Sequence, residues 1–119
     1  MKQLVWIGSS LEDMRDFPDE VRRAVGYALY QAQMGGKHPD AKPLKGFGGG
    51  GVLEVVEDFD GETYRGVYTV KFRNVVYVLH AFKKKAKHGI ATPKQDIDLI
   101  KARLRRAQEH YEQQKEQKQ

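Results

Sequence analysis

A block of cations follows directly on an apolar segment in the second half of the chain. Residues 75–82 are almost entirely apolar, and the cations that come next are Lys83, Lys84, Lys85, Lys87 and His88. A continuous apolar run of this length is typical of a strand that is buried on both faces. The cations therefore stand at the end of a rigid element, and cations held in fixed positions suit a polyanion, above all nucleic acid.

Three further polar side chains fall within predicted strands. Arg65 lies in the middle of one, where a cation needs either an internal partner or a ligand. His80 lies in the apolar run, and its parity places it on one face with Val78 and Phe82. His80 and Tyr68 each fit two roles, because either side chain can transfer a proton or simply pack in the core.

The composition bounds the class of protein. The chain has 119 residues, enough for one domain with its own core, which we expect over residues 1–112, followed by a polar tail at 113–119 that frays. Lys and Arg number 21 against 16 Asp and Glu, and this net charge of +5 favours an anionic partner. Cysteine is absent and the four histidines lack the spacing of metal ligands, so we expect no metal site and no cofactor. Because no segment resembles a signal peptide or a membrane span, we expect a cytoplasmic protein with no membrane contact.

The hydrophobic pattern predicts an α+β fold in the order β-α-α-β-β-β-α, with a small, antiparallel-rich sheet packed by helices. Strands are expected at 4–7, 52–59, 63–72 and 75–82, with a hairpin turn at Asp60-Gly61 and a second tight turn at Arg73-Asn74. Alternation along 63–72 places Arg65 on one face and Tyr68 on the other. The residues that share the face of Arg65 are Val67 and Lys71, and Tyr64 shares the face of Tyr68. In the same way Lys83 and Lys85 share a face that Lys84 opposes.

Capping signals mark the predicted helices. Ser9 and Glu12 form a possible capping box, Pro18 opens a second helix that ends at Gly35-Gly36, and Thr92-Pro93 opens the last. Residues 36–51 are expected to form a loop. The glycines of this loop match no phosphate-binding motif. Lys42, Lys45 and Phe47 make this loop a candidate RNA contact, although solvated lysines on a loop explain it as well.

Several short motifs, taken in their order and spacing, resemble the RelE/HigB-like toxins of type II toxin–antitoxin systems, in the phage-derived branch. The resemblance covers about residues 3–112 and is carried by 43–46 (PLKG), 52–55 (VLEV), 64–68 (YRGVY), 78–84 (VLHAFKK), 92–93 (TP) and 102–104 (ARL). It implies a RelE-like fold and a small basic endoribonuclease that cuts mRNA, commonly on the ribosome. It also implies a cognate antitoxin that keeps the toxin silent.

The chemistry of RNA cleavage is compatible with these residues. RNA supplies its own nucleophile, the 2′-hydroxyl, so an enzyme must orient it, remove its proton, stabilise the charged transition state and protonate the leaving oxygen, and none of these steps requires a metal. We expect Arg65 and Lys84 to hold the scissile phosphate with help from Lys83. His80 or Tyr68 is expected to transfer protons. The residues expected to bind RNA around them are Lys45, Lys71, Arg73, Lys85, Lys87 and His88.

Two other functions stay open. Some proteins with the fold of these toxins poison DNA gyrase, and a chain of this kind can also be a module that binds RNA or its antitoxin without catalysis. In each case an antitoxin that covers the basic face with an acidic or amphipathic segment is the expected partner.

Overall fold

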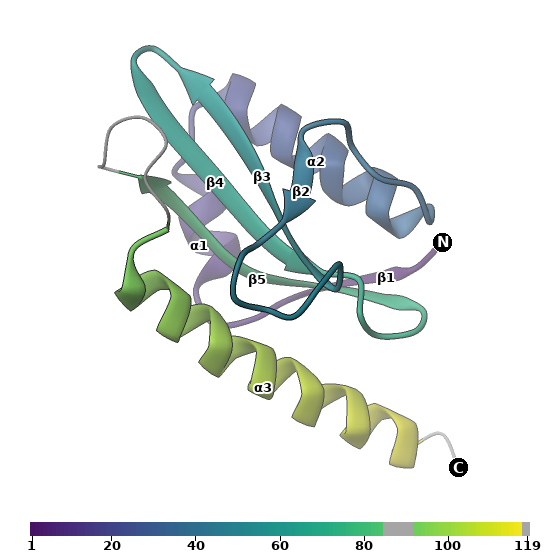
Figure 1. The fold of residues 1–119 in the computed structure, drawn as a ribbon. Coiled ribbons are helices and arrows are strands. Elements are labelled where there is room, and N and C mark those ends of the chain that lie inside the picture. The colour runs from purple at the N-terminus through teal and green to yellow at the C-terminus, as the bar shows by residue number, and fades with distance from the viewer. Residues whose placement is uncertain (85–91, 118–119) are drawn as a thin grey trace.

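Five strands form one mixed sheet in the computed structural model, which describes residues 1–84 and 92–117 (Figure 1). The order across the sheet is β1-β5-β4-β3-β2, in which β1 is parallel to β5 and all other neighbours are antiparallel. The expected α+β class and antiparallel-rich sheet are confirmed. The strands are β1 (Gln3–Trp6), β2 (Ala41–Pro43), β3 (Val52–Phe59), β4 (Glu62–Thr69) and β5 (Val75–Lys84).

Helices cover both faces of this sheet. α1 (Ser10–Arg15) and α2 (Asp19–Gln33) lie on one face, and α3 (Lys94–Gln117) crosses the other (Figure 1). α2 buries an apolar stripe that consists of Val21, Val25, Ala28, Leu29 and Ala32. α3 buries Ile100 and Ala107 against the opposite face. Among the residues that the structure describes, no helix is both long and apolar enough to cross a membrane.

The hairpin between β3 and β4 forms at the predicted turn. Asp60 and Gly61 have φ angles of 52° and 78°, as a two-residue type I′ turn requires. The resulting register pairs Phe59 with Glu62 and Val56 with Arg65. The predicted faces of β4 are confirmed, because Val67 packs in the core under α3 whereas Tyr64 and Tyr68 pack in the core under α2.

Local structure differs from the predictions at several places, among them the ends of β1 and β5. The segment expected to be a loop contains β2, which pairs with β3. β4 ends at Thr69 instead of residue 72, because the Thr69 hydroxyl accepts the N–H of Lys71. The predicted capping box is wrong, since Ser9 makes no side-chain capping bond to the α1 backbone and its hydroxyl donates to Asp13. α3 continues to Gln117, within the segment that the sequence predicts to fray.

A β-bulge in β5 changes the face on which the later residues of that strand lie. Tyr68 pairs with Val78 and Val67 pairs with His80, so Leu79 is the extra residue. Leu79 and His80 consequently both face α3, and the predicted sharing of one face by Val78 and His80 is wrong. Beyond the bulge alternation resumes, which puts His80, Phe82 and Lys84 on the α3 side and Lys83 on the other.

Candidate nucleic-acid interface

Arg65 and Lys84 come together on the side of the sheet that faces α3. Arg65 pairs with Phe82, and Thr63 with Lys84, so the two cations are diagonal neighbours on one face of β4 and β5. Lys84 is only 5% exposed. Within residues 1–84 and 92–117, no carboxylate lies within ion-pair distance of its ammonium group. The structure therefore combines a buried lysine with a nearby arginine at the place where a phosphate clamp is predicted.

An acidic side chain, Glu54 on β3, lies next to Arg65. Glu54 was not among the site residues predicted from the sequence. One of its oxygens, Oε2, accepts a hydrogen bond from Arg65 Nη1 at 2.7 Å, and Oε1 lies 3.9 Å from Lys42 Nζ. Glu54 is 5% exposed, whereas the side chain of Lys42 is 62% exposed. We call Lys42, Glu54, Arg65 and Lys84 the charged cluster; Lys42 stands at its open end. An acid inside the apolar stretch VLEVV was the signal that could have identified Glu54.

The charges of the cluster act on one another. Burial lowers the pKa of Lys84 most, and the neighbouring guanidinium of Arg65 lowers it further, against the opposing effect of Glu54. Arg65 also reaches Thr92 Oγ1, 3.4 Å from its Nη1, so the start of the α3 segment touches the cluster. Its Nε atom is buried and has no hydrogen-bond partner among the described residues. The cluster thus holds three cations and one carboxylate, with at least one buried donor unused.

His80 fastens α3 to the sheet. Its Nε2 lies 2.9 Å from Asp96 Oδ1 at the start of α3, and its Nδ1 lies 3.5 Å from Arg103 Nη1. Because Arg103 can only donate, we assign the Nε2–H tautomer, which donates to Asp96. The ring also stacks on Phe82, with 4.5 Å between centroids. Both ring nitrogens of His80 therefore contact side chains of α3.

Arg103 makes further polar contacts between α3 and the sheet. Its Nη1 donates to the carbonyl of Leu79 at 2.9 Å, which satisfies a backbone acceptor at the bulge, and its Nη2 donates to Ser9 Oγ at 3.0 Å. Gly8, at φ 58°, makes room for this guanidinium, since a Cβ there would lie 2.8 Å from Arg103 Nε. Arg103 therefore links α3, the bulge and the segment before α1, and this link fixes the face that Lys84 occupies.

We predict that acid weakens the fold through His80. Burial and Arg103 lower its pKa, against the hydrogen bond and charge of Asp96 and the charge of Asp13, with burial the largest effect. As the pH falls below about 6.5 the unfolded chain therefore takes up this proton first, so the contribution of neutral His80 is full above that pH and lost below it. Urea denaturation at pH 7.5 and 5.5 should show a larger loss of unfolding free energy for the wild type than for His80→Gln. Equal losses in the two proteins would contradict the prediction.

Tyr68 and Lys83 lie away from the cluster. Tyr68 is 1% exposed under α2, and burial raises its pKa to about 12. Lys83 faces the same side as Tyr64, is exposed, and lies 3.9 Å from Glu62. The sheet therefore separates both side chains from Arg65 and Lys84.

The residues predicted to bind RNA around the site are only partly described. Lys45, Lys71 and Arg73 are exposed in loops. Phe47 packs at the margin of the core under α3, with Lys101 Nζ 6.0 Å from its ring centroid. Lys85, Lys87 and His88 lie outside the described residues. Within the part of the chain that is described, no group of three or more His, Asp or Glu side chains is arranged to hold a metal ion.

One comparison with known proteins matches most of this chain to a protein family. A family model described as "Phage derived protein Gp49-like (DUF891)" matches residues 12–105, a range that includes Glu54, Arg65, His80, Lys84 and Arg103. No curated protein and no solved structure matches the chain. The match spans most of α1, all of α2, all strands except β1, and the first half of α3.

Proposed function

The chain belongs to the phage-derived Gp49-like family, which is associated with the toxins of toxin–antitoxin systems, and from this premise we propose that it is a metal-independent endoribonuclease that cuts mRNA. The observation that supports this proposal best is the charged cluster. Lys42, Arg65 and Lys84 carry three positive charges against the single carboxylate of Glu54. Buried excess charge costs folding free energy, and such groups concentrate where a charged ligand binds.

The cluster offers donors that suit a phosphate. Arg65 uses Nη1 for Glu54, while its buried Nε has no partner among the described residues. A guanidinium presents its donors in a planar fork that matches phosphate oxygens. Lys84 supplies a second positive charge from the neighbouring strand, and the exposed Lys42 meets the substrate first. We expect the phosphodiester to lie between Arg65 and Lys84, where both cations stabilise the charge of the transition state.

Glu54 and Lys84 are the groups proposed to move protons. The Glu54 carboxylate accepts the proton of the 2′-hydroxyl while the 2′ oxygen bonds to phosphorus. The bond from phosphorus to the 5′ oxygen breaks, and that oxygen takes a proton from the Lys84 ammonium. Because burial and Arg65 lower the pKa of Lys84, its ammonium is a better acid than that of an exposed lysine. The products are a 2′,3′-cyclic phosphate and a 5′-hydroxyl end.

The setting of this reaction follows from the family association. We propose that the substrate is mRNA, reached on the ribosome in the cytoplasm, and that a cognate antitoxin holds the toxin silent. His80 and Arg103 act through α3 by holding the strand that carries Lys84. Tyr68 and Lys83 have no part in the proposed chemistry, because they lie on the other face.

The test is cleavage of a short single-stranded RNA by the purified chain. We expect 2′,3′-cyclic phosphate and 5′-hydroxyl ends, unchanged rates in EDTA, and no cleavage where a 2′-deoxynucleotide replaces the nucleotide before the cut. Glu54→Gln and Arg65→Lys should each lower the rate by about 10²-fold or more. Lys83→Met, which removes a neighbouring cation from the opposite face, should leave the rate unchanged. If free RNA is not cut, the same variants are compared on translating ribosomes.

Two results would contradict the proposal. Intact transcripts together with DNA damage, in cells whose growth stops when the chain is expressed, would point to a gyrase poison. Absence of both growth arrest in such cells and RNA cleavage on ribosomes would point to a module that only binds.

A further inference from the structure

The outer surface of α2 carries a row of large side chains that the proposed reaction does not use. Tyr27, Tyr30 and Met34 follow one another at helical spacing and are 55%, 48% and 59% exposed. They lie on the side of α2 away from the sheet, since Val21, Val25 and Ala28 occupy the buried side. We call these three residues the α2 stripe. Tyrosine and methionine are enriched where proteins bind one another, and three such residues in a row on one helix fit a docking surface.

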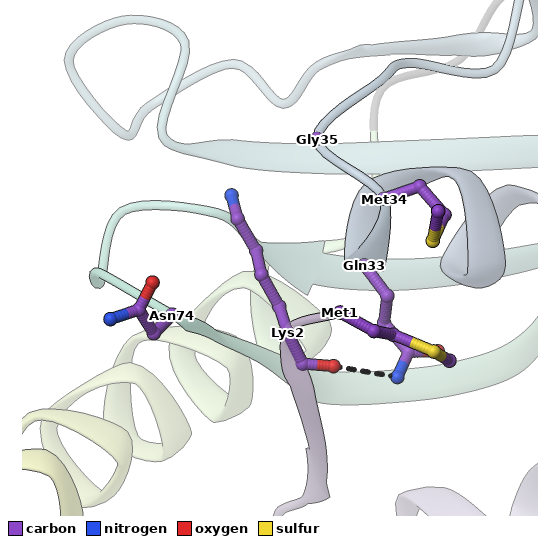
Figure 2. A pocket seen from close by; sticks show the side chains of 6 residues that line it. All are labelled: Met1, Lys2, Gln33, Met34, Gly35 and Asn74. Atoms are coloured by element: carbon purple, nitrogen blue, oxygen red, sulfur yellow. Dashed lines mark hydrogen bonds between the residues drawn. The ribbon is translucent and has the colours of Figure 1, made fainter.

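A shallow pocket continues the α2 stripe at its Met34 end. Its lining comes from the end of α2, the start of β1 and the turn before β5, as Figure 2 shows: Met1, Lys2, Gln33, Met34, Gly35 and Asn74. Met1 is 83% exposed, and Gln33 Nε2 donates to the carbonyl of Lys2 at 2.8 Å. Two methionines and three polar side chains thus line a hollow beside a helix, where a side chain of a partner can insert.

Charges around the α2 stripe indicate the chemistry of the partner. Arg23 is exposed one turn before Tyr27, Lys37 is exposed just after Met34, and Lys2 lines the pocket. Asp40 is the nearest exposed acid in the following loop, and its carboxylate lies 3.9 Å from His38 Nδ1. An antiparallel contact between two copies would bring the cations at one end of the stripe toward those at the other, which disfavours a second copy of this chain.

From these observations we infer that the α2 stripe and its pocket bind an amphipathic, acidic helix of a partner protein. The apolar side of that helix covers Tyr27, Tyr30 and Met34, and its carboxylates meet Arg23, Lys37 and Lys2. The stripe lies on the face of the sheet opposite the charged cluster. The helix on the stripe therefore docks the partner without itself covering the cluster. Only the identification of the partner as the antitoxin rests on the proposed function.

The experiment measures complex formation with the protein encoded by the neighbouring gene. The chain, tagged at its C-terminus, is co-expressed with that protein, and affinity is measured by calorimetry with the mass checked by light scattering. Tyr30→Glu places a carboxylate in the centre of the stripe and should weaken binding roughly a hundredfold. Leu99→Glu, at the exposed hydrophobic residue of α3, and Arg65→Lys in the charged cluster should bind as the wild type does. Arg23→Glu combined with Lys37→Glu should slow association about tenfold and reduce its salt dependence.

The remaining outcomes overturn the inference. These are unchanged binding by Tyr30→Glu, loss of binding in Leu99→Glu or Arg65→Lys instead, a homodimer that Tyr30→Glu dissolves, or no complex at all. RNA cleavage by Tyr30→Glu is measured in parallel and should equal that of the wild type. Absence of cleavage with an intact, stripe-dependent complex would contradict only the proposed reaction.

Discussion

Lys84→Met is expected to abolish RNA cleavage and at the same time to stabilise the fold. Loss of the proposed proton donor and phosphate ligand should lower the rate by about 10²–10⁴-fold. The unfolding free energy should rise by about 1 kcal/mol, because methionine fills a similar volume without a buried charge. Lys84 is 5% exposed, Arg65 stands beside it, and Glu54 is the acid among the described residues that acts against this positive charge. Single-turnover cleavage and urea denaturation of the same preparation measure the two effects.

The pH dependence gives this prediction a second readout. Because the pKa of Lys84 is lower in the folded chain than in the unfolded one, the folded chain releases this proton first as the pH rises. The stability difference between Lys84→Met and the wild type should be full at neutral pH and shrink as the pH approaches the ordinary lysine pKa. Lys83→Met is the control, and it should change neither the cleavage rate nor this pH dependence. A Lys84→Met protein that is less stable than the wild type at pH 7 would show that the amine is satisfied in the fold.

Removal of Glu54 alone is expected to destabilise the fold strongly. Glu54→Leu leaves Arg65 buried without its carboxylate partner, and breaking a buried pair in this way costs roughly 3–5 kcal/mol. Arg65→Met in the same chain should restore much of that loss, since two apolar side chains of similar volume replace the pair. Denaturation of the wild type, both single variants and the double variant gives the coupling energy directly.

The chain contains a matched control for this cycle. Lys83 and Glu62 also pair across β4 and β5, 3.9 Å apart, but their side chains are 46% and 47% exposed. Lys83→Met and Glu62→Leu should couple by no more than about 1 kcal/mol. A coupling at Glu54 and Arg65 as small as that of the exposed pair would mean that water reaches the cluster freely.

The hairpin explains why part of the charged cluster follows from the sequence. Asp60-Gly61 specifies a two-residue turn, and that turn fixes the register of every later pair along β3 and β4. Counting back from it places Glu54 and Arg65 on one face as diagonal neighbours, within reach of long side chains. The pairing of Arg65 was therefore available from local signals, even though Glu54 was passed over as one residue of an apolar strand.

The face of the sheet on which His80 lies could not be predicted from local sequence signals in this way. Its face depends on the bulge at Leu79, and the carbonyl there is satisfied by Arg103, 24 residues further along the chain. No local pattern in residues 75–82 signals an extra residue, because every position there suits a strand. β2 could not be predicted from the sequence either, because a strand of three residues beside a glycine-rich loop has too little hydrophobic periodicity.

The bulge in β5 also decides which of two adjacent lysines serves the charged cluster. With regular alternation through Leu79, Lys83 would face α3 and Lys84 would lie on the side of Tyr64; with the bulge their places are exchanged. Because Lys83 and Lys84 are adjacent, a one-residue slip in this strand would still bring a lysine to the charged cluster. If one residue is inserted between Val78 and Phe82 without forming a second bulge, we expect Lys83 to take the place of Lys84.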